Sequence, residues 1–352
     1  MADFCGWDIG GVHLKLSRLR CAGDTASIVT RIEPFEIWRE PAGLAPRLRA
    51  LLGDVAIEPG AAHAVTMTAE LSDVFPTRIE GVRSILRACA EALPAGPRVL
   101  DRRGALIDLG EAMERPIDVA AANWAATARL VGRVARNALL VDVGSTTTDI
   151  IPVRDGEPCP AGRSDTERLQ SGELVYSGVL RTPPASLCDV VPLRGSMCRV
   201  APEHFTTMAD VYLILGSITA GEFTTPTADG RGRTRREAMT RLARLVCADL
   251  DEIGPAAVEA MAGFLKDRQV DRLARAIVQV LSRAECAGIT TAVPAGAGAF
   301  LADEAARRAG LAASRLASLV PSVQGEGWDR SAPAAALAVL MASDNGALRF
   351  TN

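Results

Sequence analysis

The sequence predicts a mixed α/β fold with two lobes, and three observations support this prediction. The chain has 352 residues, more than twice a typical domain of about 150 residues. Short apolar runs typical of strands alternate with segments whose apolar residues recur every three or four positions, as in amphipathic helices. A strand-turn-strand pattern at residues 6–15 also recurs at residues 140–149.

Strands and helices are expected to alternate along the chain. The expected strands are 4–9, 12–19, 62–67, 137–143, 147–153 and 211–216. The expected helices are 43–52, 81–92, 120–134, 235–251, 270–284 and 299–309. The polar stretch 155–171 contains Gly and Pro and is interpreted as a connection or a lid.

Composition excludes several classes of protein. Lys and Arg number 39 against 42 Asp and Glu, a net charge of −3, so no basic field attracts nucleic acid. No apolar run approaches the roughly 20 residues of a membrane span, and no basic-then-apolar leader opens the chain. The eight cysteines include no C-x-x-C pair, which argues against a zinc site and a disulfide framework. We therefore expect a cytoplasmic protein without nucleic-acid or membrane partners, and a homo-oligomer remains an option.

The repeated pattern predicts two phosphate-binding hairpins. Residues 6–15 (GWDIGGVHLK) and 140–149 (LVDVGSTTTD) each contain an apolar strand that ends in Asp-x-Gly, a turn of small residues and a returning strand. Glycine in such a turn permits positive φ and leaves backbone N–H groups uncovered for phosphate oxygens. The candidate phosphate-binding residues are Gly10, Gly11, Gly144, Ser145, Thr146, Thr147 and Thr148.

An aspartate stands at the end of the first strand of each hairpin. Asp8 and Asp142 could hold Mg²⁺, which neutralises the phosphates that the turns would bind. A single Asp-x-Gly turn is usually an ordinary hairpin, but the presence of two favours a shared phosphate site.

The two hairpins resemble those of the actin-like ATPase and sugar kinase superfamily, which clamp a phosphate chain between two lobes of a ribonuclease H-like fold. Residues 293–299 (VPAGAGA) are similar to a later glycine-rich turn that borders the nucleotide there, so Gly296 and Gly298 are expected at the substrate pocket. Close packing of a helix on a strand is the alternative role of these glycines. The expected lobes are 1–125, joined by a returning helix within about 331–352, and 126–330.

Further segments narrow the resemblance. Residues 7–15, 66–73 (TMTAELSD), 122–124 (ANW), 142–149 and 227–231 (TADGR) resemble a hydantoinase-A-related group linked to the tetrahydromethanopterin one-carbon pathway of methanogens and methylotrophs. The resemblance covers roughly residues 5 to 340. It implies a methanofuran biosynthesis enzyme that transfers an aminomethylfuran-methyl group from its diphosphate to the phenol oxygen of γ-glutamyltyramine. Diphosphate would be released with Mg²⁺ bound and without ATP.

Three residues are candidates for the chemistry of this transfer. Lys15 is one of only two lysines and lies on the returning strand of the first hairpin, where it could stabilise the departing diphosphate. Glu70 follows the expected strand 62–67 and is the preferred general base for a phenol whose pKa is near 10. His13 is the second candidate base. Surface exposure of Lys15, a capping role for Glu70 and a structural role for His13 are the alternatives.

Four further residues could contact substrate. Asn123 and Trp124 are expected to contact the furan or tyramine ring, and core packing of Trp124 is the alternative. Arg231 and Arg233 lie in the turn-rich loop 227–236, which could fold over the diphosphate or could be a solvated basic loop.

Two other functions stay open at this point. The same fold could serve an ATP-dependent small-molecule kinase or a hydantoinase- or oxoprolinase-type cyclic-amide hydrolase. A non-enzymatic nucleotide-binding scaffold is the third reading. Release of diphosphate without ATP would distinguish the transferase from both, whereas formation of ADP would favour the kinase or hydrolase.

Overall fold

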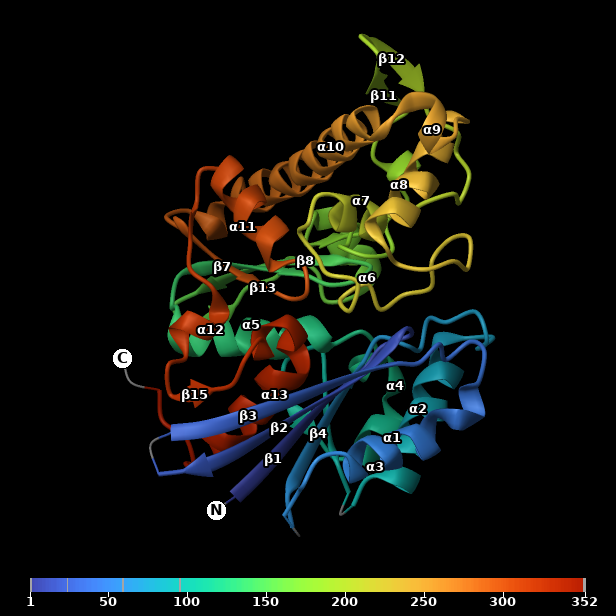
Figure 1. Cartoon of the computed structure of the whole chain (residues 1–352). Helices are drawn as coiled ribbons and strands as arrows, with labels where there is room; N and C mark the ends of the chain where they lie inside the picture. Colours follow the sequence, from blue (N-terminus) through green and yellow to red (C-terminus); the bar gives the residue numbers. More distant parts are fainter. Residues whose placement is uncertain (1, 24, 59, 95, 351–352) are drawn as a thin grey trace.

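The computed structural model describes residues 2–23, 25–58, 60–94 and 96–350. Two mixed sheets with helices on their faces organise this part of the chain (Figure 1). Sheet A has the strand order β15-β3-β2-β1-β4-β5-β6, and sheet B has the order β10-β8-β7-β13-β14 with β9 paired to β8. The predicted α/β class is therefore confirmed.

The bounds of the strands follow. Sheet A contains β1 (Ala2–Ile9), β2 (His13–Ala22), β3 (Thr25–Pro34), β4 (Ala62–Met67), β5 (Arg98–Leu100), β6 (Leu106–Ile107) and β15 (Val323–Gln324). Sheet B contains β7 (Ala138–Val143), β8 (Thr148–Arg154), β9 (Glu157–Pro158), β10 (Leu174–Val175), β13 (Thr291–Ala295) and β14 (Ala312–Ala313). A separate hairpin consists of β11 (Val190–Leu193) and β12 (Ser196–Arg199).

The helices connect and cover these strands. The α-helices are α1 (Leu44–Gly53), α2 (Arg78–Ala92), α3 (Leu109–Glu114), α4 (Pro116–Val119), α5 (Asn123–Val134), α6 (Asp165–Ser171), α7 (Met208–Ile214), α8 (Arg235–Ala243), α9 (Leu250–Ile253), α10 (Pro255–Leu281), α11 (Ala299–Arg308), α12 (Leu316–Leu319) and α13 (Ala332–Asp344). Short 3₁₀ segments are η1 (Pro41–Gly43), η2 (Pro184–Ser186), η3 (Arg244–Val246), η4 (Ala284–Cys286) and η5 (Trp328–Ser331). Within the described ranges, none of these helices has the length and hydropathy that a membrane span requires.

The sequence repeat is also a structural repeat. In sheet A, β1 pairs antiparallel with β2 and parallel with β4. In sheet B, β7 pairs antiparallel with β8 and parallel with β13. Each sheet therefore begins with the same hairpin and then adds a parallel strand on the other side of its first strand.

Helices α5 and α13 lie between the two sheets (Figure 1). Helix α13 packs on β1, β2 and β4, whereas α5 packs on β7, β8 and α13. Every residue from Ala332 to Ala342 is buried, as expected for a helix that is covered on all sides. The expected returning helix is thus α13, which packs on sheet A. The expected lobe boundary at residue 125 falls within α5, and the division into lobes stays a prediction.

The close approach of α13 to β1 depends on Gly6. A Cβ atom at this position would overlap the carbonyl oxygen of Ala334 and would lie 2.9 Å from the backbone nitrogen of Ala338. Real Cβ atoms do not approach other heavy atoms so closely, so a side chain at position 6 would push the helix away from the sheet.

Two of the expected elements are wrong. The expected strand 211–216 lies mostly within α7, whose residues are all buried, so the apolar run carried no helical periodicity. At the start of this helix the backbone amide of Thr207 donates to the carboxylate of Asp210 at 3.2 Å. The expected helix 235–251 is divided into α8, η3 and α9, because Cys247 adopts a φ of 56° and Asp249 caps a new helix. The stretch 155–171 is a connection that contains β9 and α6.

Replacement of Gly6 by alanine tests the packing of α13. Gly6→Ala should lower the free energy of unfolding by about 3 kcal/mol, because the added methyl group meets rigid backbone. The matched control is Gly263→Ala in α10, where no atom lies within 4 Å of the added Cβ. That change should raise stability by about 0.5 to 1 kcal/mol through helix propensity. Urea unfolding measures both variants, and equal stability of the two would contradict the packing argument.

Candidate functional site

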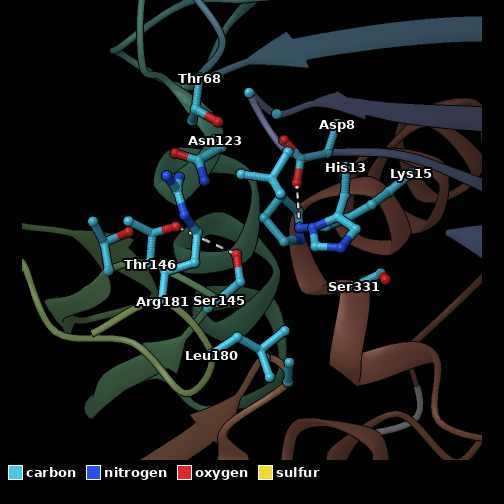
Figure 2. A pocket seen from close by; sticks show the side chains of 18 of the residues that line it. Asp8, His13, Lys15, Thr68, Asn123, Ser145, Thr146, Leu180, Arg181 and Ser331 are labelled. Carbon is cyan, nitrogen blue, oxygen red and sulfur yellow. Dashed lines mark hydrogen bonds and ion pairs between the residues drawn. The ribbon is translucent and has the colours of Figure 1, made fainter. Parts of the chain in front are cut away.

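Both predicted hairpins line one cavity of about 1070 Å³. Its walls come from elements of sheet A and of sheet B, and Figure 2 shows Asp8, His13 and Lys15 facing Ser145 and Thr146 across it. The predicted site residues that line this cavity are Asp8, Gly10, Gly11, His13, Lys15, Glu70, Asn123, Asp142, Gly144, Ser145, Thr146, Thr147 and Gly296.

The turns of the two hairpins close in the same way. The amide of Gly10 donates to the carbonyl of His13 at 3.0 Å, and the amide of Gly144 donates to that of Thr147 at 2.8 Å. None of Gly10, Gly11 and Gly144 has a positive φ, so the turns do not use the left-handed conformation that glycine permits. Small size is the requirement instead, since a Cβ on Gly10 would lie 3.0 Å from the carbonyl oxygen of His13.

Several backbone amides of the second turn remain available for a ligand. Within the described residues, the amides of Ser145, Thr146 and Thr147 donate to no protein acceptor. The carbonyls of Gly144 and Ser145, by contrast, accept hydrogen bonds from residues 179–181. The turn is thus fixed through its carbonyls, while its donors stay free to bind an anion.

The segment that fixes this turn was not predicted. A Cβ on Gly178 would lie 2.5 Å from the amide nitrogen of Thr146, so only glycine lets residues 177–182 pass beneath the turn. Gln269 donates from Nε2 to the carbonyl of Gly178 at 2.9 Å and holds the segment from α10. Thr148, predicted to bind phosphate, instead donates to the carbonyl of Ser177 at 2.6 Å and does not line the cavity. No local sequence signal marks this segment, because its partners are distant in the chain.

Among the carboxylates that line the cavity, Asp8, Asp142 and Asp149 interact with one another. Asp8 accepts from the ammonium of Lys15 at 2.8 Å, and Asp149 pairs with the buried guanidinium of Arg168. Burial and the neighbouring Asp149 raise the pKa of Asp142 to about 7. Burial alone would lower the pKa of Lys15, but Asp8, Asp142 and Asp149 raise it, so this side chain is a cation at neutral pH.

The donors at the cavity fit a magnesium ion that a phosphate substrate helps to coordinate. Asp8 Oδ1 is buried without a hydrogen-bond partner among the described residues, and Asp142 stands in an excess of negative charge. Mg²⁺ commonly takes one or two carboxylates and completes its shell with water and phosphate oxygens. The described residues contain no group of three or more His, Cys, Asp or Glu that could hold a metal ion without such help.

The two candidate bases have opposite pKa shifts. Glu70 is buried at the cavity wall, and burial raises the pKa of its carboxyl, although a hydrogen bond from Arg78 opposes this shift. Its Oε2 has no partner within the described residues. Burial, together with the cations of Lys15 and Arg181, lowers the pKa of His13 to about 4. His13 Nε2 lies 2.7 Å from Thr224 Oγ1, so the imidazole has a structural partner.

The expected substrate-pocket residues divide between the cavity and the core. Asn123 begins α5 at the cavity wall, just after Ala121, which adopts an uncommon φ of 49°. Trp124 is 2% exposed and stacks under Arg168 at 4.9 Å, so it packs in the core. Gly296, with a φ of 83°, lies against Asp142, whereas Gly298 packs on Val143 away from the cavity.

The arginines of loop 227–236 do not reach this cavity. Neither Arg231 nor Arg233 is among its lining residues. Arg231 lies 3.9 Å from Asp229 in a weak ion pair, and Arg233 lies over the ring of Phe223 at 5.7 Å. The loop is anchored by buried Arg241, which bonds both Asp210 and Asp229, and therefore does not fold over the hairpins.

Arg181 is a cation at this cavity that the sequence analysis did not identify. Arg181 lines the cavity beside the second hairpin (Figure 2). Its backbone amide donates to the carbonyl of Ser145 at 2.9 Å. Its guanidinium lies over the ring of Trp38 at 5.6 Å. Within the described residues Arg181 has no carboxylate partner, unlike the other cations that line the cavity, Lys15, Arg168 and Arg330.

A contact between the two sides of the cavity was also not predicted. The Nη2 atom of Arg78, at the start of α2, donates to Glu70 at 3.0 Å and to Asp165 of α6 at 2.8 Å. The arginine thus links the candidate base on the sheet A side to a helix on the sheet B side.

Comparison with known proteins gives this site a context. Residues 61–342 match the family model described as hydantoinase/oxoprolinase. A Methanocaldococcus jannaschii protein named (4-{4-[2-(gamma-L-glutamylamino)ethyl]phenoxymethyl}furan-2-yl)methanamine synthase is 36% identical over 249 residues, which cover 70% of this chain and 72% of that protein. A Methanococcus vannielii protein of the same name is 38% identical over 118 residues, 34% of this chain and 53% of that protein.

A solved structure supports the fold. A nucleotide-free acetone carboxylase matches with a TM-score of 0.53 at 12% identity, over 96% of this chain and 70% of the other. The acetone carboxylase structure thus shares the two-sheet fold of this chain. Membership of the actin-like ATPase and sugar kinase class stays a prediction. On the extent of the family match and the identity to the synthases, this chain is an enzyme that belongs to the hydantoinase/oxoprolinase family.

Proposed function

We propose that the enzyme acts in methanofuran biosynthesis and transfers an aminomethylfuran-methyl group from its diphosphate to the phenol oxygen of γ-glutamyltyramine. The observation that carries this proposal is the 36% identity to a synthase named for that phenoxymethylfuran ether. The cavity supports it, because two hairpins with free amides and cations suit a diphosphate.

The proposed step makes one bond and breaks one bond. The phenol oxygen attacks the methylene carbon attached to the furan, and the bond from that carbon to the diphosphate oxygen breaks. The electron pair leaves with the diphosphate, and the phenol proton passes to Glu70. The step is neither an oxidation nor a reduction, and it requires no nucleotide.

Glu70 suits the role of base better than His13. A base works best when its pKa is near the working pH, and burial moves the pKa of Glu70 upward toward that range. The pKa of His13 is about 4, so its imidazole is a weak base. His13 is then better suited to orient substrate beside Thr224.

The leaving diphosphate would be stabilised by groups of the residues that line the cavity. The free amides of residues 145–147 would bind its oxygens, and Lys15 and Arg181 would balance the charge that develops as the bond breaks. Mg²⁺ held by Asp8 and Asp142 would supply further charge neutralisation.

A coupling assay without nucleotide tests the proposed function. Purified protein is incubated with the furan-methyl diphosphate, γ-glutamyltyramine and Mg²⁺. The expected products are the ether, detected by its mass, and an equal amount of free diphosphate. Absence of the ether without ATP, with ADP released only when ATP and the tyramine acceptor are present, would contradict the transferase and favour the kinase or hydrolase.

Loss of Lys15 should mainly slow turnover, whereas loss of Arg181 should mainly weaken the binding of diphosphate. Lys15→Ala should slow turnover by roughly 100-fold with a smaller change in substrate affinity, since its charge matters most as the diphosphate leaves. Arg181→Gln should weaken diphosphate binding by about tenfold, because its guanidinium lines the cavity and within the described residues has no carboxylate partner for the phosphate to displace. Calorimetry with Mg-diphosphate and single-turnover kinetics separate the two effects. The control Arg87→Gln removes an exposed arginine of α2 that lies outside the cavity lining, and an equal effect of this change would overturn the assignment.

Asp142 should make stability depend on pH. Its carboxyl has a pKa of about 7 in the folded protein and near 3.9 in the unfolded chain, so stability falls as the pH rises from 4 to 7 and then levels off. In EDTA, Asp142→Asn should therefore gain about 2 to 4 kcal/mol over the parent at pH 8 and nothing at pH 4. Denaturant unfolding measures this gain. Asp189→Asn, at an 84% exposed side chain, serves as control, and a pH-independent difference for Asp142→Asn would refute the raised pKa.

A further inference from the structure

A second cavity adjoins the first. It measures about 550 Å³ and shares Val12, Gly221 and Thr224 with the wall of the hairpin cavity. Its remaining walls come from the end of β3, the segment before α1, and loop 221–233 on the other side. The three shared residues place the two cavities next to each other, on opposite sides of Val12 and Thr224.

This second cavity contains two opposite charges without ion-pair partners. Two other arginines of its wall are neutralised, since Arg39 pairs with Glu36 at 2.6 Å and Arg47 pairs with Glu33 at 3.0 Å. Arg233 and Glu40 also line the cavity, and within the described residues neither has an oppositely charged partner. The cavity thus offers one cation and one anion to a ligand.

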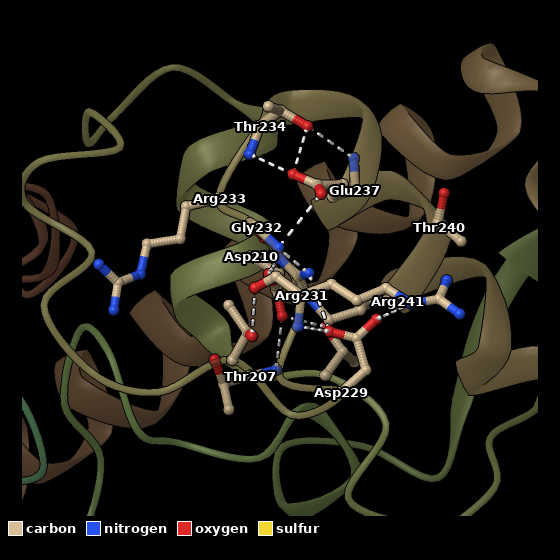
Figure 3. Close-up of polar contacts among 12 residues, drawn as sticks. Thr207, Asp210, Asp229, Arg231, Gly232, Arg233, Thr234, Glu237, Thr240 and Arg241 are labelled. Carbon is tan, nitrogen blue, oxygen red and sulfur yellow. Dashed lines mark hydrogen bonds and ion pairs between the residues drawn. The ribbon is translucent and has the colours of Figure 1, made fainter.

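Arg233 is held in place by its loop. Buried Arg241 bonds Asp210, Asp229 and the carbonyl of Gly232, which anchors the loop beside Arg233. Figure 3 shows that the side chain of Arg233 points away from this network. Its guanidinium lies over Phe223 and donates to the carbonyl of Thr225 at 3.2 Å, so part of its conformational entropy is already lost.

We propose that this second cavity binds the α-amino-acid end of γ-glutamyltyramine, with Arg233 on the α-carboxylate and Glu40 on the α-ammonium. This inference rests on the proposed function for the identity of the acceptor. A γ-glutamyl group keeps both charges of an amino acid, at the end of the molecule opposite to the phenol. The phenol then reaches the hairpin cavity past Val12 and Thr224. Arg233, predicted to bind diphosphate, selects the acceptor instead.

Calorimetry with three acceptors tests this site. The acceptors are γ-glutamyltyramine, γ-aminobutyryl-tyramine, which lacks the α-carboxylate, and glutaryl-tyramine, which lacks the α-ammonium. Each is titrated into the whole protein, alone and with Mg-diphosphate. Arg233→Gln should weaken the binding of γ-glutamyltyramine by about tenfold. It should not change the binding of γ-aminobutyryl-tyramine, which lacks the α-carboxylate. Glu40→Gln should weaken the binding of γ-glutamyltyramine by a similar factor. It should not change the binding of glutaryl-tyramine, which lacks the α-ammonium. The control Arg236→Gln, at a 74% exposed arginine on α8, should leave all three affinities unchanged.

The outcomes distinguish this inference from the proposed reaction. Losses that are equal for all three acceptors, or no loss in either variant, would overturn the amino-acid site even if the ether product forms. Failure of the parent to bind γ-glutamyltyramine in both conditions would overturn it as well. If the ether does not form but the affinities change as expected, the proposed transfer is wrong and the amino-acid site stands.

Discussion

Electrostatic repulsion among Asp8, Asp142 and Asp149 is the constraint on which the rest of the site depends. Charges in a partly buried cavity repel each other far more strongly than charges in water. Lys15 compensates Asp8, and Arg168 compensates Asp149. For Asp142, burial and this repulsion raise the pKa of its carboxyl and so favour the protonated, neutral form. The guanidinium of Arg168 also lies over the ring of Trp124, which is buried in the apolar core and supports it.

The two hairpins have diverged at one cross-strand position. Lys15 lies opposite Asp8 in sheet A, and the same register places Asp149 opposite Asp142 in sheet B. The first hairpin therefore neutralises its own aspartate, whereas the second adds a negative charge and recruits α6 to balance it. A structural repeat has in this way produced two chemically different halves of one cavity.

Local patterns were sufficient to predict the hairpins but not their surroundings. The Asp-x-Gly turns, Glu70 after β4 and the start of α5 at Asn123 are marked by short motifs, and the structure brings them to one cavity. Strand β3 was not predicted, because its ten residues are mostly polar or partly exposed. Helix α7 was predicted as a strand because complete burial removes the periodicity of a helix. Arg181 carried no local signal, since its role comes from the hydrogen bonds that fix residues 177–182 under a turn far away in sequence.

Polar contacts join the sides of the hairpin cavity. Arg78 of α2 meets Asp165 of α6, and His13 of β2 meets Thr224 of the loop that precedes α8. Arg330 of η5 also pairs with Glu222 of that loop. Separation of the two sides would have to break these contacts together. A ligand that touches both hairpins opposes the same separation. A bound ligand and these contacts therefore stabilise the same arrangement of the two hairpins, so that tighter binding of the ligand and stronger contacts both favour the closed cavity.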